Sequence, residues 1–127
     1  MVVAVTIVSL FDFVAGRLHP LPAGLDPADP ANLERLKAHI AATPGSALAL
    51  VLAGWIAGPF AGGIVASRVA GTNRRQYPWI IMALLFAATI ANFFAFPHPT
   101  WMIVGAVIGI PSAAWWASRL APPDERR

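Results

Sequence analysis

The sequence predicts an all-α membrane protein, a polytopic bundle of four transmembrane helices that the whole chain, residues 1–127, forms as a single domain. Two observations predict this fold class. The chain is 57% hydrophobic and only 12% charged, whereas about a quarter of the residues in a soluble domain are charged. Four long apolar stretches also fill most of the chain, each close to the roughly 20 residues that cross a bilayer. The lipid bilayer is therefore the expected environment.

The first span is expected over residues 2–18, and it is short for a bilayer. Arg17 near its end can reach the headgroups and complete the crossing. No positively charged side chain precedes the apolar run, and Asp12 interrupts it. Both features are unlike a signal peptide, so we expect this span to be retained.

Three further spans are expected over residues 46–70, 79–96 and 101–118. The second span follows the helix-breaking pair Pro44-Gly45. Only four residues, 97–100, separate the third span from the fourth. A link this short predicts that these two helices form an antiparallel hairpin.

The segment between the first two spans is the only sizeable polar one, and it predicts a short amphipathic helix over residues 30–42. Asp29 stands at the N-cap position and Pro30 at the first helical position. Leu33, Leu36 and Ile40 then recur at spacings of three and four. We expect this helix to lie on the outer membrane surface or to cap the bundle.

Basic residues predict the orientation of the bundle. Six of them fall on the side that holds both termini: Arg68, Arg74, Arg75, Arg119, Arg126 and Arg127. Three fall on the opposite side: Arg17, Arg35 and Lys37. Because cytoplasmic loops carry the excess of Lys and Arg, both termini are expected in the cytoplasm.

Small residues recur at every fourth position in three of the spans, which places them on one face of each helix. The expected helix-packing residues are Gly54, Gly58, Gly62 and Ala66 in the second span and Gly105, Gly109 and Ala113 in the fourth, while Ala83, Ala87, Ala91 and Ala95 form a similar stripe in the third. Missing side chains let helix backbones approach closely in lipid. The partner helix lies either in the same chain, in another copy as a homo-oligomer, or in another membrane protein.

An internal repeat is one interpretation of this pattern. When the chain is shifted so that Gly54 falls on Gly105, Ala-Ser-Arg-Val-Ala at residues 66–70 falls on Ala-Ser-Arg-Leu-Ala at residues 117–121. Two helical hairpins related by an axis along the membrane normal would produce such a parallel repeat. The alternative is that small-residue helices ending in Arg resemble one another without any repeat.

Asp12 and Asn92 are the candidate polar pair within the membrane. A carboxylate at the centre of a membrane helix costs about 2.5 to 3.5 kcal/mol, so such residues are often functional. Asp12 and Asn92 are expected at similar depth near the outer ends of their helices. One hypothesis is a hydrogen-bonded pair used in proton exchange. The other is that Asp12 is hydrated at the interface or only holds two helices together.

Pro59 and Pro111 lie near the middle of the second and fourth spans. Proline removes a backbone hydrogen bond and kinks a helix, and paired interruptions at matching depth can indicate a substrate site. Packing kinks are the preferred interpretation, because no charged residue accompanies these prolines at that depth.

His19, His39 and His98 all fall on the outer side, where imidazoles can bind a metal. Their spacing matches no ligand signature, so we expect no bound metal. These three histidines are the only candidate ligands that the sequence offers.

The sequence also lacks the nucleophile and phosphate-binding motifs of common enzyme classes. We therefore expect no catalytic residues, no cofactor, no enzymatic activity and no nucleic acid partner.

Two segments, residues 36–71 and residues 90–111, resemble a group of small four-helix bacterial membrane proteins of unknown function. The shared features are the outer-loop helix ending in Pro44, the glycine-rich second span, and the sequence from Asn92 through Pro97-His98-Pro99 to Trp101. This resemblance implies a location in the bacterial inner membrane and implies no activity.

Two function hypotheses follow from these observations. In the first, the protein is a non-catalytic membrane module that packs against itself or against a larger complex. In the second, it is a minimal transporter or channel for a small solute or protons, with Asp12 and Asn92 along the route.

Overall fold

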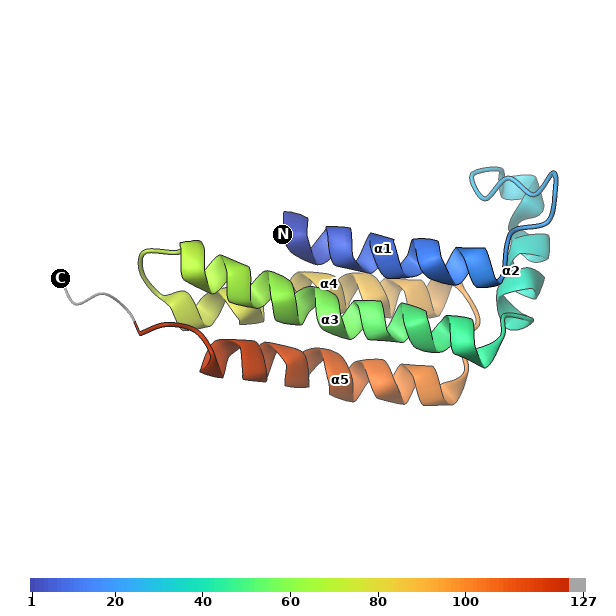
Figure 1. Ribbon diagram of the computed structural model, residues 1–127. Helices are drawn as coiled ribbons and strands as arrows, with labels where there is room; N and C mark the ends of the chain where they lie inside the picture. Colours follow the sequence, from blue (N-terminus) through green and yellow to red (C-terminus); the bar gives the residue numbers. More distant parts are fainter. Residues whose placement is uncertain (124–127) are drawn as a thin grey trace.

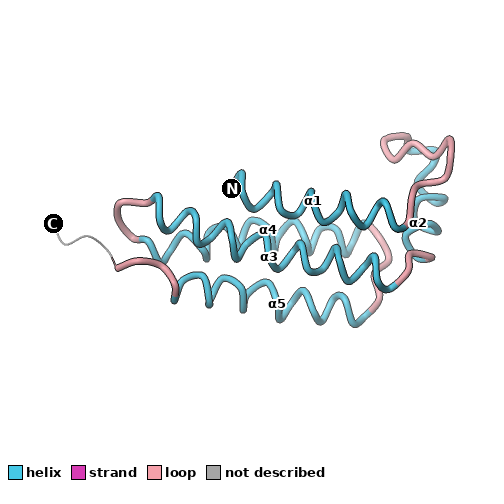
Figure 2. The backbone as a smooth tube through the Cα atoms, in the orientation of Figure 1, coloured by secondary structure: helices cyan, strands magenta, loops and turns pink. Residues whose placement is uncertain are grey.

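The computed structural model describes residues 1–123, and within them every regular element is helical, which confirms the predicted all-α class. Figure 2 shows the helices and the loops that join them. The elements in order are α1 (Val2–Leu18), η1 (Pro30–Asn32), α2 (Leu33–Ala41), α3 (Gly45–Val69), η2 (Arg74–Gln76), α4 (Tyr77–Ala95) and α5 (Thr100–Arg119).

Three of the described helical segments are long and apolar enough to cross a membrane: Gly45–Val69, Arg74–Ala95 and Thr100–Arg119. Helix α1 has 17 residues, slightly fewer than the roughly 20 that a typical crossing needs. The structure is therefore compatible with a membrane protein that has at least these three candidate spans. A fourth crossing would have to be made by α1.

Helix α3 occupies the centre of the bundle and packs against α1, α4 and α5. Helices α4 and α5 also pack against each other as an antiparallel hairpin, whereas α1 packs extensively only on α3. The N-terminus and the turn between α3 and α4 lie toward one end of the bundle, and α2 lies across the other (Figure 1). We call these the inner end and the outer end.

The contact between α1 and α3 is built on glycine. A Cβ atom added to Gly58 would lie 2.9 Å from the carbonyl oxygen of Ala4, and one added to Gly62 would lie 2.6 Å from the Cβ of Ala4. A Cβ added to Gly54 would meet the side chain of Phe11. Ala4 itself is 0% exposed. The two backbones approach this closely only because α3 carries no side chain on that face.

The other small-residue faces have different surroundings. Gly105 and Gly109 of α5 face the flexible side chains of Leu52 and Ile56 on α3, with Ala113 buried on the same helix and Ala66 of α3 half-buried. The stripe on α4 is exposed. A repeat of two hairpins would set the α5 glycines against α4, just as the α3 glycines contact α1. The glycine contacts do not follow that repeat.

The interior at mid-depth is filled by side chains. Trp55, Met102, Ala106 and Ile110 form the buried cluster, and the last three are 0% exposed. Pro59 is also fully buried, and α3 continues through it. Helix α5 likewise continues through Pro111. The prolines are accommodated within continuous helices.

The amphipathic helix lies where the sequence predicts it. The Asp29 carboxylate accepts a hydrogen bond from the backbone N–H of Ala31 at 2.9 Å, and Pro30 occupies the first position. This cap satisfies a backbone donor that the helix itself cannot satisfy. The loop of residues 19–29 precedes it and leads from α1 across the outer end.

Candidate functional site

The outer end of the bundle holds a pocket of about 370 Å³, which we call the outer pocket. Such a volume lies within the range of small-molecule sites. Its lining includes most of the polar residues that the sequence singles out, together with one tryptophan of α3: Asp12, His19, His39, Trp55, Asn92 and His98. Leu36, His39 and Ile40 of α2 close its outer side. Residues far apart in the sequence therefore share one site.

Asp12 and Asn92 line this pocket from α1 and α4. Within residues 1–123, neither side chain makes a hydrogen bond, so the predicted direct bond between them is absent from the structure. The nearby guanidinium of Arg17 lies over the ring of Phe13, 5.0 Å from its centroid. The two predicted residues thus share a cavity without bonding to each other.

His19 and His39 hold the end of α1 against α2. Their rings stack with centroids 4.1 Å apart, and Nε2 of His19 lies 3.3 Å from the carbonyl oxygen of His39. Because a carbonyl only accepts, this nitrogen must carry the proton. Nδ1 of a neutral His19 is then an acceptor. The stack fixes α2 over the outer pocket.

His98 belongs to an aromatic cluster. Its Nδ1 donates to the carbonyl oxygen of Phe96 at 2.8 Å. Its ring lies edge-on to Phe93, with centroids 5.2 Å apart, and tilted against Trp55 at 5.9 Å. The short turn between α4 and α5 thereby directs this imidazole toward α3.

The three histidines do not form a metal site. No group of three or more metal-binding side chains with suitable geometry occurs in the described part of the chain. Zinc would need imidazole nitrogens converging at about 2 Å from one point. Instead, two of the rings stack face to face and the third packs against aromatic side chains.

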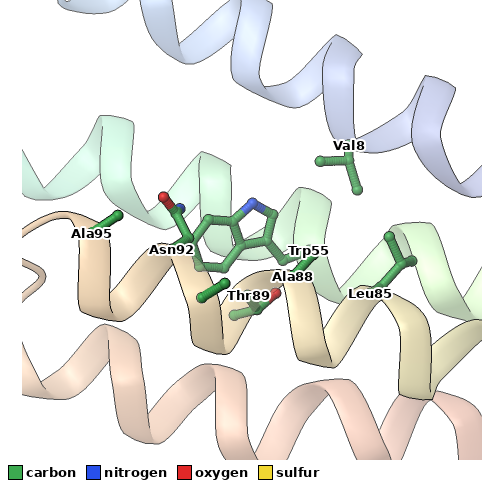
Figure 3. A pocket seen from close by; sticks show the side chains of 8 residues that line it. Val8, Trp55, Leu85, Ala88, Thr89, Asn92 and Ala95 are labelled. Carbon is green, nitrogen blue, oxygen red and sulfur yellow. The ribbon is translucent and has the colours of Figure 1, made fainter. Parts of the chain in front are cut away.

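A second depression runs inward from the outer pocket, and we call it the groove. It measures about 450 Å³ and lies between α1 and α4, with Trp55 of α3 between them (Figure 3). Val8, Leu85, Ala88 and Thr89 line it. Trp55 and Asn92 line both the groove and the outer pocket, so the two are adjacent.

The two prolines do not take part in this site. Neither Pro59 nor Pro111 lines the outer pocket or the groove. Pro111 lies at a separate shallow pocket that faces Trp115 and Trp116 near the inner end. The structure therefore separates the prolines from the polar residues.

Trp55 is the residue of the site that sequence reasoning missed. It is 8% exposed, and its indole lies where the outer pocket meets the groove. A tryptophan about ten residues into a span, away from both interfacial belts, was the available signal, because membrane tryptophans concentrate at the interfaces.

The arrangement offers one carboxylate, one amide and three imidazole rings in a pocket next to a largely apolar groove. It can bind a ligand with a polar, hydrogen-bonding head and an apolar tail. The Thr43 hydroxyl, which lines the outer pocket, donates to the backbone carbonyl of His39 at 3.2 Å. No family model, no curated protein and no solved structure matches this chain.

Proposed function

We propose that this chain is a non-catalytic, four-span protein of the bacterial inner membrane that acts as a helix-packing module. The observation that carries the proposal is the filled interior. Met102, Ala106 and Ile110 are 0% exposed where a route across the bundle would have to pass. A protein that conducts or transports needs such a route, whereas a packing module does not.

Helix α1 makes the fourth crossing in this proposal. It runs beside α3, and apolar side chains dominate its outward face, with Val2 80% and Phe13 60% exposed. Such exposure is costly in water and favourable in lipid. Arg17 at its outer end and the loop beyond it extend the short apolar length toward the headgroups.

Both termini are cytoplasmic in this topology. Among the described residues, the inner end carries Arg68, Arg74, Arg75 and Arg119, and the outer end carries Arg17, Arg35 and Lys37. Arg126 and Arg127, which also support this orientation, lie outside the described residues. The excess of positive charge at the inner end supports its cytoplasmic placement.

Single-cysteine labelling tests the topology directly, because the chain contains no cysteine. We expect a membrane-impermeant maleimide to label Ala28→Cys in intact cells. Val2→Cys and Thr72→Cys should react only after the membrane is permeabilised. Labelling of Val2→Cys from outside, with Thr72→Cys protected, would show that α1 does not cross the membrane.

The packing role predicts self-association through the exposed alanine face of α4. Mass determination in nanodiscs should give a multiple of the 13.4 kDa chain mass. Ala83→Leu combined with Ala87→Leu should return the protein to the monomer, because two large side chains prevent close helix approach. Ser9→Leu, on the exposed face of α1, is the matched control. If the wild-type protein is a monomer, the partner of this face has to be a different membrane protein.

Transport is the second candidate, because the outer pocket reaches Asp12 and Asn92. A transporter would have to open the filled interior in another conformation. Proteoliposomes loaded with a pH-sensitive dye test this candidate. Proton flux that depends on the protein and is lost in Asp12→Asn would favour transport over the packing module, and flux equal to that of empty vesicles would eliminate proton transport.

A further inference from the structure

The outer pocket and the groove together have the length of one leaflet. Val8 and Leu85 are the deepest residues lining the groove, and each lies about ten residues from the outer end of its helix. At about 1.5 Å per residue this is a depth of about 15 Å. The hydrocarbon core of a bilayer is about 30 Å thick. The outer pocket and the groove together therefore reach as deep as an acyl chain of the outer leaflet.

Below its mouth the groove is lined mainly by apolar side chains, with Thr89 as the exception. Leu85 and Ala88 of α4 line it together with Val8 of α1 (Figure 3), and Ala91 lines it as well. The alanines leave space that larger side chains would fill, and α1 and α4 do not pack closely against each other. The groove thus offers an apolar channel that is open to the surrounding lipid.

The outer pocket, next to the groove, carries polar groups without hydrogen-bond partners. The Asp12 carboxylate, the Asn92 amide and the indole N–H of Trp55 make no hydrogen bond within residues 1–123. In hydrocarbon, each unsatisfied polar group is costly. A ligand that bonds to these groups supplies the hydrogen bonds that the protein alone does not make.

The charge of the outer pocket determines which headgroup this ligand carries. Asp12 is the only acidic residue in α1, α3, α4 and α5. Among residues 1–123, no Lys or Arg lines the outer pocket or the groove, and Arg17 is turned onto Phe13. An unpaired carboxylate attracts a cation. A primary ammonium supplies three donors, which suit the oxygens of Asp12 and Asn92.

We infer that the outer pocket and groove bind an outer-leaflet phospholipid with a primary-amine headgroup. Its ammonium group lies against Asp12 and Asn92, and one acyl chain lies in the groove beside Trp55. This inference goes beyond the packing role. The two share the embedding of the bundle in a bilayer, and Ala91 and Ala95 belong both to the alanine stripe of α4 and to the lining of the groove.

Native mass spectrometry of the purified protein tests the inference with three lipids that have identical acyl chains. The probes are phosphatidylethanolamine, phosphatidylcholine and phosphatidylglycerol. We expect wild-type protein to retain phosphatidylethanolamine most strongly. Asp12→Asn should lower this retention about tenfold, because a hydrogen bond to a charged group is lost. Glu34→Gln, which removes an exposed outer carboxylate paired with Lys37 at 3.1 Å, should leave retention unchanged.

A pair of adjacent substitutions tests the groove independently of the charge. Ala88 lines the groove and its neighbour Ala87 does not, although both are exposed alanines of α4. Ala88→Phe should fill the groove and abolish retention, and Ala87→Phe should retain the lipid as wild type does. The unfolding midpoint of each variant shows whether it is folded.

Several results would overturn the inference. These are equal retention of the three lipids by wild type, a preference for phosphatidylglycerol, or unchanged retention in a folded Asp12→Asn variant. A dimer that Ala88→Phe converts to monomer, without lipid bound to wild type, would assign the groove to a second copy. If Ala88→Phe does not fold, the wild-type comparison and Asp12→Asn still decide. None of these results bears on the topology that cysteine labelling measures.

Discussion

Helix α1 meets its two neighbours in opposite ways. Toward α3 it lies against glycine, close enough that a Cβ on Gly58 or Gly62 would touch Ala4. Toward α4 it is separated by the groove, whose α4 wall includes three alanines, Ala88, Ala91 and Ala95. Small residues occur on both sides. Small-residue spacing therefore predicts which faces permit close approach, and it does not predict which of those faces a neighbour occupies.

The largest expected effect comes from closing the glycine face. Gly58→Val combined with Gly62→Val places side chains where the backbone and Cβ of Ala4 lie. Overpacking of this kind costs about 1 to 3 kcal/mol per site. We expect α1 to separate from α3, with a lower unfolding midpoint in an SDS titration. An unchanged midpoint would show that this contact contributes little to stability.

A smaller effect is expected at the outer end, where the groove opens and the glycine contact is not involved. His19→Ala removes the ring stack with His39 and the hydrogen bond to its carbonyl. The expected loss is about 1 kcal/mol, typical of one ring contact or hydrogen bond. Faster hydrogen exchange confined to residues 30–41 would be the signature. Uniformly faster exchange throughout the bundle would contradict this local role.

Gly105→Ala should cost less than about 1 kcal/mol, although Gly105 belongs to the same kind of stripe as Gly58. Its added Cβ would meet the tip of the Leu52 side chain at 2.7 Å rather than a backbone. A flexible side chain can change rotamer to make room. The same SDS titration measures the difference. A loss as large as that of the double valine variant would mean that α5 packs as rigidly as α1.

The smallest effect is expected for the single substitution Ala87→Leu on the exposed face of α4. Substitutions at surface positions usually change stability by less than about 0.5 kcal/mol. The unfolding midpoint of the monomer should stay at the wild-type value. A marked decrease would reveal an intramolecular neighbour on this face.

Hydropathy and capping signals predict most of this fold. The apolar runs locate α3, α4 and α5, and the Asp29-Pro30 pair locates the start of the amphipathic helix. These features depend on residues close together in the chain, which is why a sequence reveals them. The length of α1 is the exception, because its 17 residues fall at the limit of a crossing.

The site is predictable only in part. The polarity and depth of Asp12 and Asn92 single them out, and the structure places both at one pocket. Their separation by a cavity and the position of Trp55 beneath them depend on how α1, α3 and α4 pack. Packing in lipid is set by side-chain shape rather than by hydropathy. The glycine stripes are compatible with several ways of packing these helices.

The weak lateral support of α1 has a consequence for assembly. Its main contact is the glycine face of α3, and the loop of residues 19–29 joins it to the helices that follow. Cutting the polypeptide in that loop leaves the contact intact. We expect the protein to work as a split pair, with the first helix and the remaining fragment, made separately, recombining in the same membrane.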